Sequence, residues 1–201
     1  MPVMLLCIIV FLFWLNYEIR KAERKQKQND DTFWERENKA NFARPADISN
    51  LSYISVPVDM LPFTETEDDK LNEIQDKILT LSQKKILNLT GYSNTDLKLA
   101  YGPGNLPALS DYDYNFTLLA RTLQQWAEYL YERQEIEKTK IILEYAISCK
   151  TDVSKSYLLL ASIYREEGNY AKIKELKDTA GSLRTLMKDH ILEELTAILK
   201  S

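Results

Sequence analysis

The stretch LLASIYREEGNYAK, residues 159–172, joins two predicted amphipathic helices, residues 153–167 and 170–180. Apolar side chains recur there at the three- to four-residue spacing of a helix face. The same periodicity runs through the neighbouring segments, residues 112–134, 136–148 and 183–199. Because the gaps between these helices are short, we expect successive helices to be antiparallel. The stretch therefore predicts an all-α fold made of stacked helical hairpins.

Residues 120–153 and 154–187 form an internal repeat with a period of thirty-four residues. Positions separated by this period carry side chains of similar type, and the matched pairs are Leu123 with Tyr157, Trp126 with Leu160, Ala127 with Ala161, Leu130 with Tyr164, and Ala146 with Ala180. Two repeats alone are too few for a stable array. We therefore expect two further helices, residues 66–89 and 183–199, to cover its ends.

This pattern resembles the tetratricopeptide repeat (TPR), whose unit is a helix-turn-helix of thirty-four residues. The resemblance implies a small antiparallel helical-hairpin, TPR-like array with residues 183–199 as a C-terminal capping helix. Lys177 departs from the pattern, because the family has a large apolar residue there. Two segments, DISNLSYISVP (residues 47–57) and NLTGYSNTDLKLAYG (residues 88–102), are also similar to those of uncharacterised membrane-anchored bacterial TPR-like proteins. That second resemblance implies no activity.

The first residues predict a transmembrane anchor. Residues 3–15, VMLLCIIVFLFWL, are all apolar, and a helix over residues 1–19 would be roughly 28 Å long, close to the ~30 Å hydrocarbon core of a bilayer. No basic residue precedes the run and no site of small residues for signal cleavage follows it. These features favour an uncleaved anchor over a signal peptide.

Basic residues gather directly after the apolar run, at Arg20, Lys21, Arg24, Lys25 and Lys27. The positive-inside rule then predicts a single-pass protein of the bacterial cell membrane, with its N-terminus outside and its C-terminal domain in the cytoplasm. The whole chain has 26 basic and 30 acidic residues, a net charge of −4. After residue 28 the balance of 21 basic and 28 acidic residues is −7. That charge repels phosphate backbones, so we expect no nucleic-acid partner.

Residues 20–65 are predicted to link the anchor to an α-helical domain at residues 66–201. Thr32 and Glu35 have the spacing of a capping box and predict a short helix over residues 33–42. Three prolines, Pro45, Pro57 and Pro62, exclude a long helix from the rest of the linker.

Residues 51–63, which we name the strap, are too apolar to stay in water as a free linker. We expect the strap to run extended and to pack along the groove of the repeats. The sequence leaves open whether that groove is free or filled by the strap.

Residue counts leave little room for catalysis. His190 is the only histidine and has no nucleophile motif beside it, and the two cysteines, Cys7 and Cys149, are too few for a four-thiolate zinc site. No phosphate-binding loop, dinucleotide fingerprint or EF-hand loop is present. We therefore expect no enzymatic activity, no cofactor and no metal.

The surface expected to bind a peptide is the groove-lining face of the first helix in each repeat. The positions that the TPR resemblance assigns to this face are Arg121, Gln124, Glu128, Tyr131, Lys155, Leu158, Ser162 and Arg165. Gln124 and Glu128 stand where the carboxylate clamp of some TPR proteins has Lys and Asn, so that binding mode is not supported. The basic residues with Tyr131 suit an acidic or extended peptide.

Taken together, these patterns predict a membrane-anchored scaffold that presents a TPR-like domain to a protein or peptide partner in the cytoplasm. Two alternatives stay open: an exported, envelope-associated binding module, and a structural subunit of a membrane complex. Neither the identity of the partner nor the oligomeric state follows from the sequence.

Overall fold

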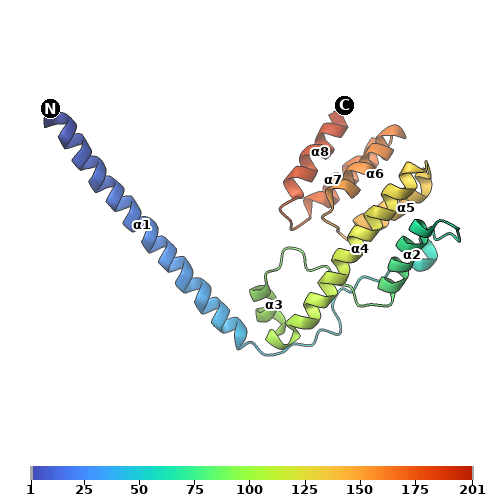
Figure 1. Cartoon of the computed structure of the whole chain (residues 1–201), viewed down its shortest axis with the longest axis horizontal. Helices are drawn as coiled ribbons and strands as arrows, with labels where there is room; N and C mark the ends of the chain where they lie inside the picture. Colours follow the sequence, from blue (N-terminus) through green and yellow to red (C-terminus); the bar gives the residue numbers. More distant parts are fainter. Residues whose placement is uncertain (1, 201) are drawn as a thin grey trace. The chain divides into compact units, whose positions relative to one another are not determined.

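A computed structural model describes the backbone of residues 2–200 and the side chains of residues 11–27 and 29–200. All regular structure in this part of the chain is helical, with no β-strand (Figure 1). The helices are α1 (Pro2–Asn41), η1 (Val58–Met60), α2 (Asp69–Ser82), α3 (Asn94–Tyr101), η2 (Pro103–Asn105), α4 (Leu106–Glu132), α5 (Ile136–Ser148), α6 (Ser154–Glu166), α7 (Tyr170–Gly181) and α8 (Lys188–Lys200). The prediction of an all-α chain is confirmed.

The prediction of a transmembrane anchor is wrong. Among the described residues, no helix combines the length and the apolar character needed to cross a bilayer. The apolar run at residues 3–15 spans only about 20 Å as a helix, short of the ~30 Å hydrocarbon core. The prediction over residues 1–19 and the single-pass cell-membrane localisation built on it are both overturned. Residues 1–10 of that prediction lie outside the side chains that the structure describes.

The chain divides into two compact units. Unit 1 consists of Met1–Ala46 and Ser93–Leu106, and unit 2 consists of Asp47–Tyr92 and Pro107–Ser201. Each unit therefore joins segments that are distant in sequence.

Unit 1 is held together where the end of α1 packs on α3. Ala40 and Leu97 are buried between these helices. The Glu37 carboxylate accepts hydrogen bonds from Lys98 and from the Thr95 hydroxyl, which lower the pKa of Glu37 below its usual value. Nothing separates residues 33–41 from the rest of α1. The separate short helix is not formed, because the Thr32 hydroxyl donates to the Asn29 carbonyl within α1 instead of capping a new helix.

Gly102 closes unit 1 behind α3. Its φ of +82° lies in a region that residues with a Cβ rarely adopt. A Cβ at this position would lie 2.7 Å from the Pro45 Cα. The close approach lets the Ala46 amide donate to the Tyr101 carbonyl at 3.0 Å. A glycine is therefore required for the two segments of unit 1 to meet.

Unit 2 contains the repeat. Helix α5 packs on α6, α6 on α7 and α8, and α7 on α8 (Figure 1). The matched pairs of the thirty-four-residue period are all buried, and they are Leu123, Trp126, Ala127, Leu130 and Ala146 in the first hairpin and Tyr157, Leu160, Ala161, Tyr164 and Ala180 in the second. The arrangement is that of a helical repeat.

The turns inside the two hairpins also repeat. Gln134 and Gly168 have φ values of 63° and 70°. The amide that follows each donates five residues back, from Glu135 to the Leu130 carbonyl and from Asn169 to the Tyr164 carbonyl. This hydrogen bond closes a Schellman turn. Helices α4, α6 and α8 end at Glu132, Glu166 and Lys200, in steps of thirty-four residues.

Helix α8 forms a polar end face. In α6, Ile163 is buried and Leu159 packs partly against the core. On α8, Glu193 and Ala197 stand thirty-four residues after Leu159 and Ile163, respectively, and both are exposed. Only Ile191 and Leu195 of α8 are fully buried. A polar outer face is what a terminal helix of a repeat array needs for solubility.

Two helices of unit 2 differ from their predicted bounds. Helix α2 was predicted over residues 66–89 and spans Asp69–Ser82. The Asp68 side chain starts it by accepting hydrogen bonds from the amides of Lys70 and Leu71. Ile86 and Leu87 stay buried through backbone hydrogen bonds to other segments instead. Helix α4 begins six residues before the predicted start at residue 112, because Pro107 is favourable in the first turn of a helix.

The strap, which belongs to unit 2, packs on helices α4 and α5 of that unit. Val56 and Leu61 are buried, and the ring of Phe63 lies 4.9 Å from that of Trp126 on α4. The Tyr145 hydroxyl on α5 donates to the Ser55 carbonyl at 3.2 Å. These contacts support the expectation of an extended, packed segment.

The strap lies on a different face of α4 from the one expected. Successive residues of a helix are turned by about 100°, so Trp126 points roughly opposite to both Gln124 and Glu128. The strap covers the Trp126 side. It therefore does not fill the predicted groove.

We expect Gly102→Ala to destabilise unit 1 by about 1–3 kcal/mol, because the backbone there suits only glycine and the new Cβ would meet Pro45. Hydrogen exchange of the α3 amides should become faster. Gly104→Ala is the matched control, since a Cβ there has no atom within 4 Å. Equal exchange in the two variants would contradict the requirement for glycine.

We expect Phe63→Ala to lower the free energy of unfolding by about 1–3 kcal/mol, since it removes the half-buried ring from Trp126. Urea unfolding measures the change. Met60→Ala is the control, because that side chain is 75% exposed. If the two substitutions cost the same, the strap contributes nothing through this contact.

Candidate functional site

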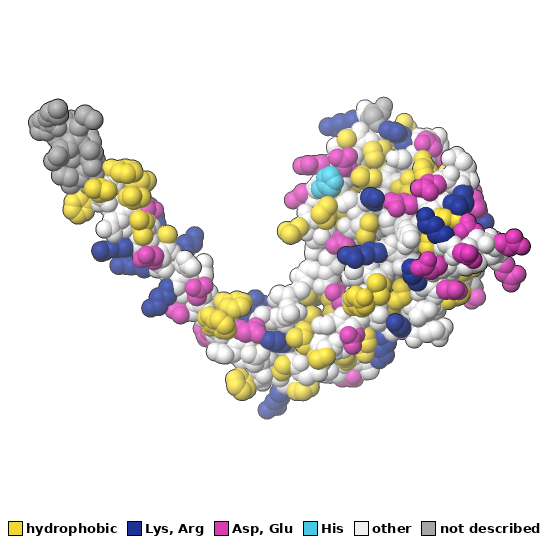
Figure 2. Space-filling model, viewed as in Figure 1, with side chains coloured by type: hydrophobic (Ala, Val, Ile, Leu, Met, Phe, Trp, Pro, Cys, Tyr) yellow, Lys and Arg dark blue, Asp and Glu magenta, His cyan; other side chains and the backbone are white. Residues whose placement is uncertain are grey.

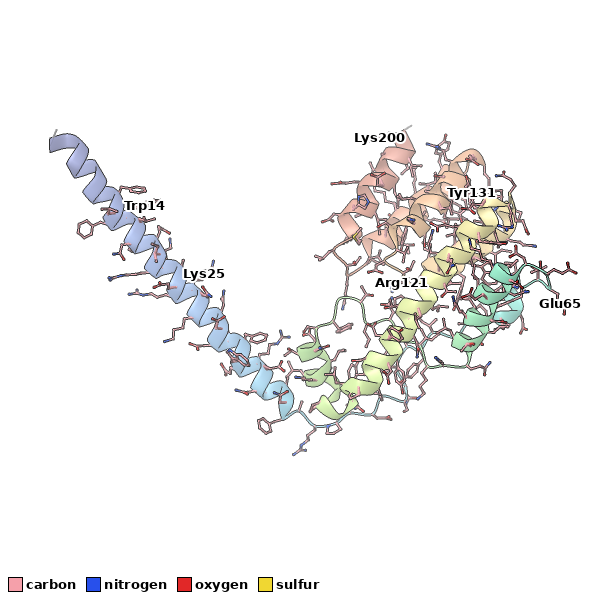
Figure 3. All side chains as sticks on the ribbon, viewed as in Figure 1. Trp14, Lys25, Glu65, Arg121, Tyr131 and Lys200 are labelled. Carbon is pink, nitrogen blue, oxygen red and sulfur yellow. The ribbon has the colours of Figure 1, made fainter. Side chains whose placement is uncertain are left out.

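The predicted binding residues lie on two helices of unit 2. Arg121, Gln124, Glu128 and Tyr131 belong to α4, and Lys155, Leu158, Ser162 and Arg165 belong to α6. Within each helix the spacing of three and four residues places the four positions along one face. Figure 3 labels Arg121 and Tyr131 on α4.

A buried hydrogen bond joins the two helices at the middle of this surface. The Ser156 hydroxyl on α6 donates to the Gln124 side-chain oxygen at 2.5 Å. Both residues are buried, with 0% and 6% of their surface exposed. The Gln124 side-chain nitrogen donates in turn to Glu128 at 3.0 Å. Gln124 is therefore occupied within the protein and is not free to contact a partner.

Glu128 also pairs with Lys155 across the two helices, at 3.3 Å between Nζ and Oε1. The Lys155 side chain is 75% exposed, so water screens this ion pair and it adds little stability. The pair does bring a carboxylate and an ammonium group to the same point of the surface. Three predicted residues, Gln124, Glu128 and Lys155, thus form one connected group with Ser156.

Arg121, Tyr131 and Ser162 do not join this group. The Ser162 hydroxyl donates to the Leu158 carbonyl within α6. Tyr131 is half-buried against the core. Arg121 is exposed and has no ion pair within the described residues, and Arg165 is also exposed.

The eight predicted residues carry three positive charges, on Arg121, Lys155 and Arg165, and the carboxylate of Glu128. Glu132 and Glu166, four residues after Glu128 and Ser162, add two exposed carboxylates to the same helix faces. The chain as a whole has a net charge of −4. The predicted residues themselves are therefore basic in sum, and two exposed carboxylates border them.

A second polar cluster ties α2 to α4, and sequence reasoning missed it. The Tyr129 hydroxyl donates to the Asp68 carboxylate, and Arg133 pairs with the same carboxylate at 3.1 Å. The Arg133 guanidinium lies 3.5 Å from the centre of the Tyr129 ring. The sequence marks Asp68 as acidic in a first turn, but no local pattern links it to residues more than sixty positions away.

Side chains with reactive groups lie apart from this surface. His190 is exposed on α8. Cys149 follows α5 and is half-buried, and burial raises the pKa of its thiol. Within the described residues, no three His, Cys, Asp or Glu side chains are grouped to hold a metal ion.

Two open clefts lie elsewhere on unit 2. One of about 370 Å³ lies between α2 and α4, with Leu81 and Leu118 among its lining residues. The other, of about 500 Å³, lies against α7 and α8 and is lined in part by Lys177, Leu192 and Thr196. Neither contains a residue of the predicted surface.

We expect Gln124→Ala to lower the free energy of unfolding by about 1–3 kcal/mol, because it leaves the buried Ser156 hydroxyl without its acceptor. Ser156→Ala should cost less stability in the Gln124→Ala variant than in the unsubstituted protein. Urea unfolding of the unsubstituted protein, the two single variants and the double variant measures this coupling. Gln125→Ala, one residue along α4 and exposed, serves as the control. Independent effects of the two substitutions would mean that the hydrogen bond does not couple the helices.

Comparisons of the chain with protein-family models, with curated proteins and with solved structures found no match. The TPR resemblance therefore stays a prediction based on the repeat. What can be said of function comes from the surface chemistry described above.

Proposed function

We propose that this chain is a protein–protein interaction module, in which a TPR-like domain binds an extended acidic segment of a partner protein. The observation that carries the proposal is the alignment of α4 with α6 by the buried Gln124–Ser156 hydrogen bond. Among the eight residues predicted to bind the partner, basic side chains outnumber carboxylates.

The chemistry of these side chains suits carboxylate recognition. Arg121 and Arg165 are exposed, and a guanidinium binds a carboxylate through two parallel hydrogen bonds. Lys155 pairs with Glu128 only weakly, so an incoming acidic residue can share its charge. Tyr131 and Leu158 are half-buried and offer apolar contact between the charged groups. An extended peptide exposes its side chains and backbone to such a surface.

The structure also favours a rigid surface. Hydrogen bonds within the protein already fix Gln124 and Glu128. Side chains that are ordered before binding lose less conformational entropy when the partner arrives. Recognition would then depend on the exposed cations of this surface.

We expect Arg121→Glu with Arg165→Glu to weaken partner binding by at least about tenfold, since each reversed charge repels an acidic segment. A crosslinkable phenylalanine at Tyr131 first identifies the partner in extracts of the source cells, with the same group at exposed Tyr170 on α7 as the positional control. Affinity for the purified partner is then measured by titration calorimetry.

Lys172→Glu with Lys174→Glu reverses two exposed charges on α7 and is the matched charge control. Circular dichroism confirms that all variants are folded. The proposal fails if both double variants bind equally well, or if crosslinks form at Tyr170 and not at Tyr131.

A further inference from the structure

Helix α1 exposes an unusual amount of apolar surface for a helix in water. Phe11, Leu12, Phe13, Trp14, Tyr17 and Ile19 are 54%, 56%, 74%, 57%, 64% and 49% exposed. Figure 2 shows these side chains in yellow along α1, and Figure 3 labels Trp14 among them. Contiguous apolar patches on a protein surface usually mark an interaction site. This segment therefore requires a partner.

The exposed segment of α1 carries an apolar stripe and a basic stripe. Phe11, Leu15, Ile19 and Ala22 follow one another at the spacing of one helix face. Arg20, Arg24 and Lys27 form a second stripe at the same kind of spacing. At about 100° per residue, the centres of the two stripes lie roughly 150° apart around the helix. Phe13 and Tyr17 lie on the side of the basic stripe, so apolar side chains surround α1 over residues 11–15 and narrow to one stripe where the basic residues begin.

The basic residues of this segment are largely unpaired. Five cations, Arg20, Lys21, Arg24, Lys25 and Lys27, stand against two carboxylates, Glu18 and Glu23. Among the described residues of this segment, the one ion pair formed is Lys21 with Glu18 at 3.4 Å. The segment therefore presents a net positive charge directly beside its apolar stripe.

We propose that residues 11–27 of α1 bind the surface of an anionic lipid bilayer, with the helix lying along the interface and not crossing it. The apolar stripe faces the acyl chains, and the basic stripe contacts the lipid phosphates. Helices with a Lys/Arg-rich polar face and Phe, Trp or Leu on the other face bind in this way. Phosphate groups neutralise the clustered cations, and the attraction falls off within a Debye length.

Charge selects this occupant over two others. A second copy of α1 would cover the apolar stripe but would leave the five cations without anionic partners. Nucleic acid would neutralise the cations but would leave Phe11, Leu15 and Ile19 in water. The lipid interface is the partner that satisfies both faces at once.

The test is cosedimentation of the full chain with vesicles. We expect binding to vesicles of phosphatidylcholine mixed with phosphatidylserine, and at least about tenfold weaker binding to phosphatidylcholine alone. Binding should decrease as salt is raised. The triple variant R20Q/R24Q/K27Q and the stripe variant L15S/I19S should each weaken binding by about tenfold or more. A blue shift of tryptophan fluorescence on binding should be lost in Trp14→Phe.

The matched control is K172Q/K174Q/K177Q on α7, which removes the same number of charges from unit 2 and should leave binding unchanged. Equal binding to both kinds of vesicle, binding to neither, or equal loss in the control would overturn the proposal. So would salt-independent binding, a dimer of the full chain that L15S/I19S disrupts, or equally tight binding to duplex DNA. The α1 variants change exposed residues, and circular dichroism checks that every variant, the control included, is folded. Because the peptide surface lies on α4 and α6, its proposal stands or falls separately.

Discussion

The hydrogen bond from Ser156 to Gln124 sets how the two first helices of the repeat meet. Both groups are buried, so each must find a partner inside the protein or lose the hydrogen bonds it would make to water. Their hydrogen bond fixes α4 against α6 at this point. Glu128 and Lys155 lie beside each other next to it. The proposed peptide surface depends on this internal contact more than on any residue exposed to solvent.

The period of thirty-four residues predicted the parts of the fold that depend on local sequence. Helix α6 ends thirty-four residues after α4 because the same turn follows both helices. In each turn one residue has a positive φ, Gln134 in the first and Gly168 in the second. The small residues at Ala127 and Ala161 are buried in the two hairpins as their spacing predicted. Local patterns failed where distant segments decide the structure. No local sequence signal near Ser82 predicts the end of α2. The helix ends there because the residues that follow form backbone hydrogen bonds with other parts of unit 2.

The candidate surface could be predicted only in part, for a related reason. Periodicity assigns residues to a helix face, but the rotation of α4 against α6 decides which of them stay exposed. Gln124 was assigned to the surface and is buried by that rotation. The strap shows the same limit, since its apolar composition predicted packing while the side of α4 that it covers depends on Trp126. In α1, the length of the apolar run suggested an anchor, but no helix among the described residues is long and apolar enough to cross a bilayer.

The polar end face of α8 affects how this repeat could be lengthened. A duplication that inserted another hairpin after α8 would place Glu193 in an interface where α6 uses Leu159, and Ala197 where α6 uses Ile163. The buried carboxylate would lack a partner, and the missing side-chain volume would leave a void. Engineered arrays based on this chain would thus grow more readily between its two hairpins than beyond α8. Copies of the second hairpin could be inserted there while the terminal helix kept its outward-facing charges.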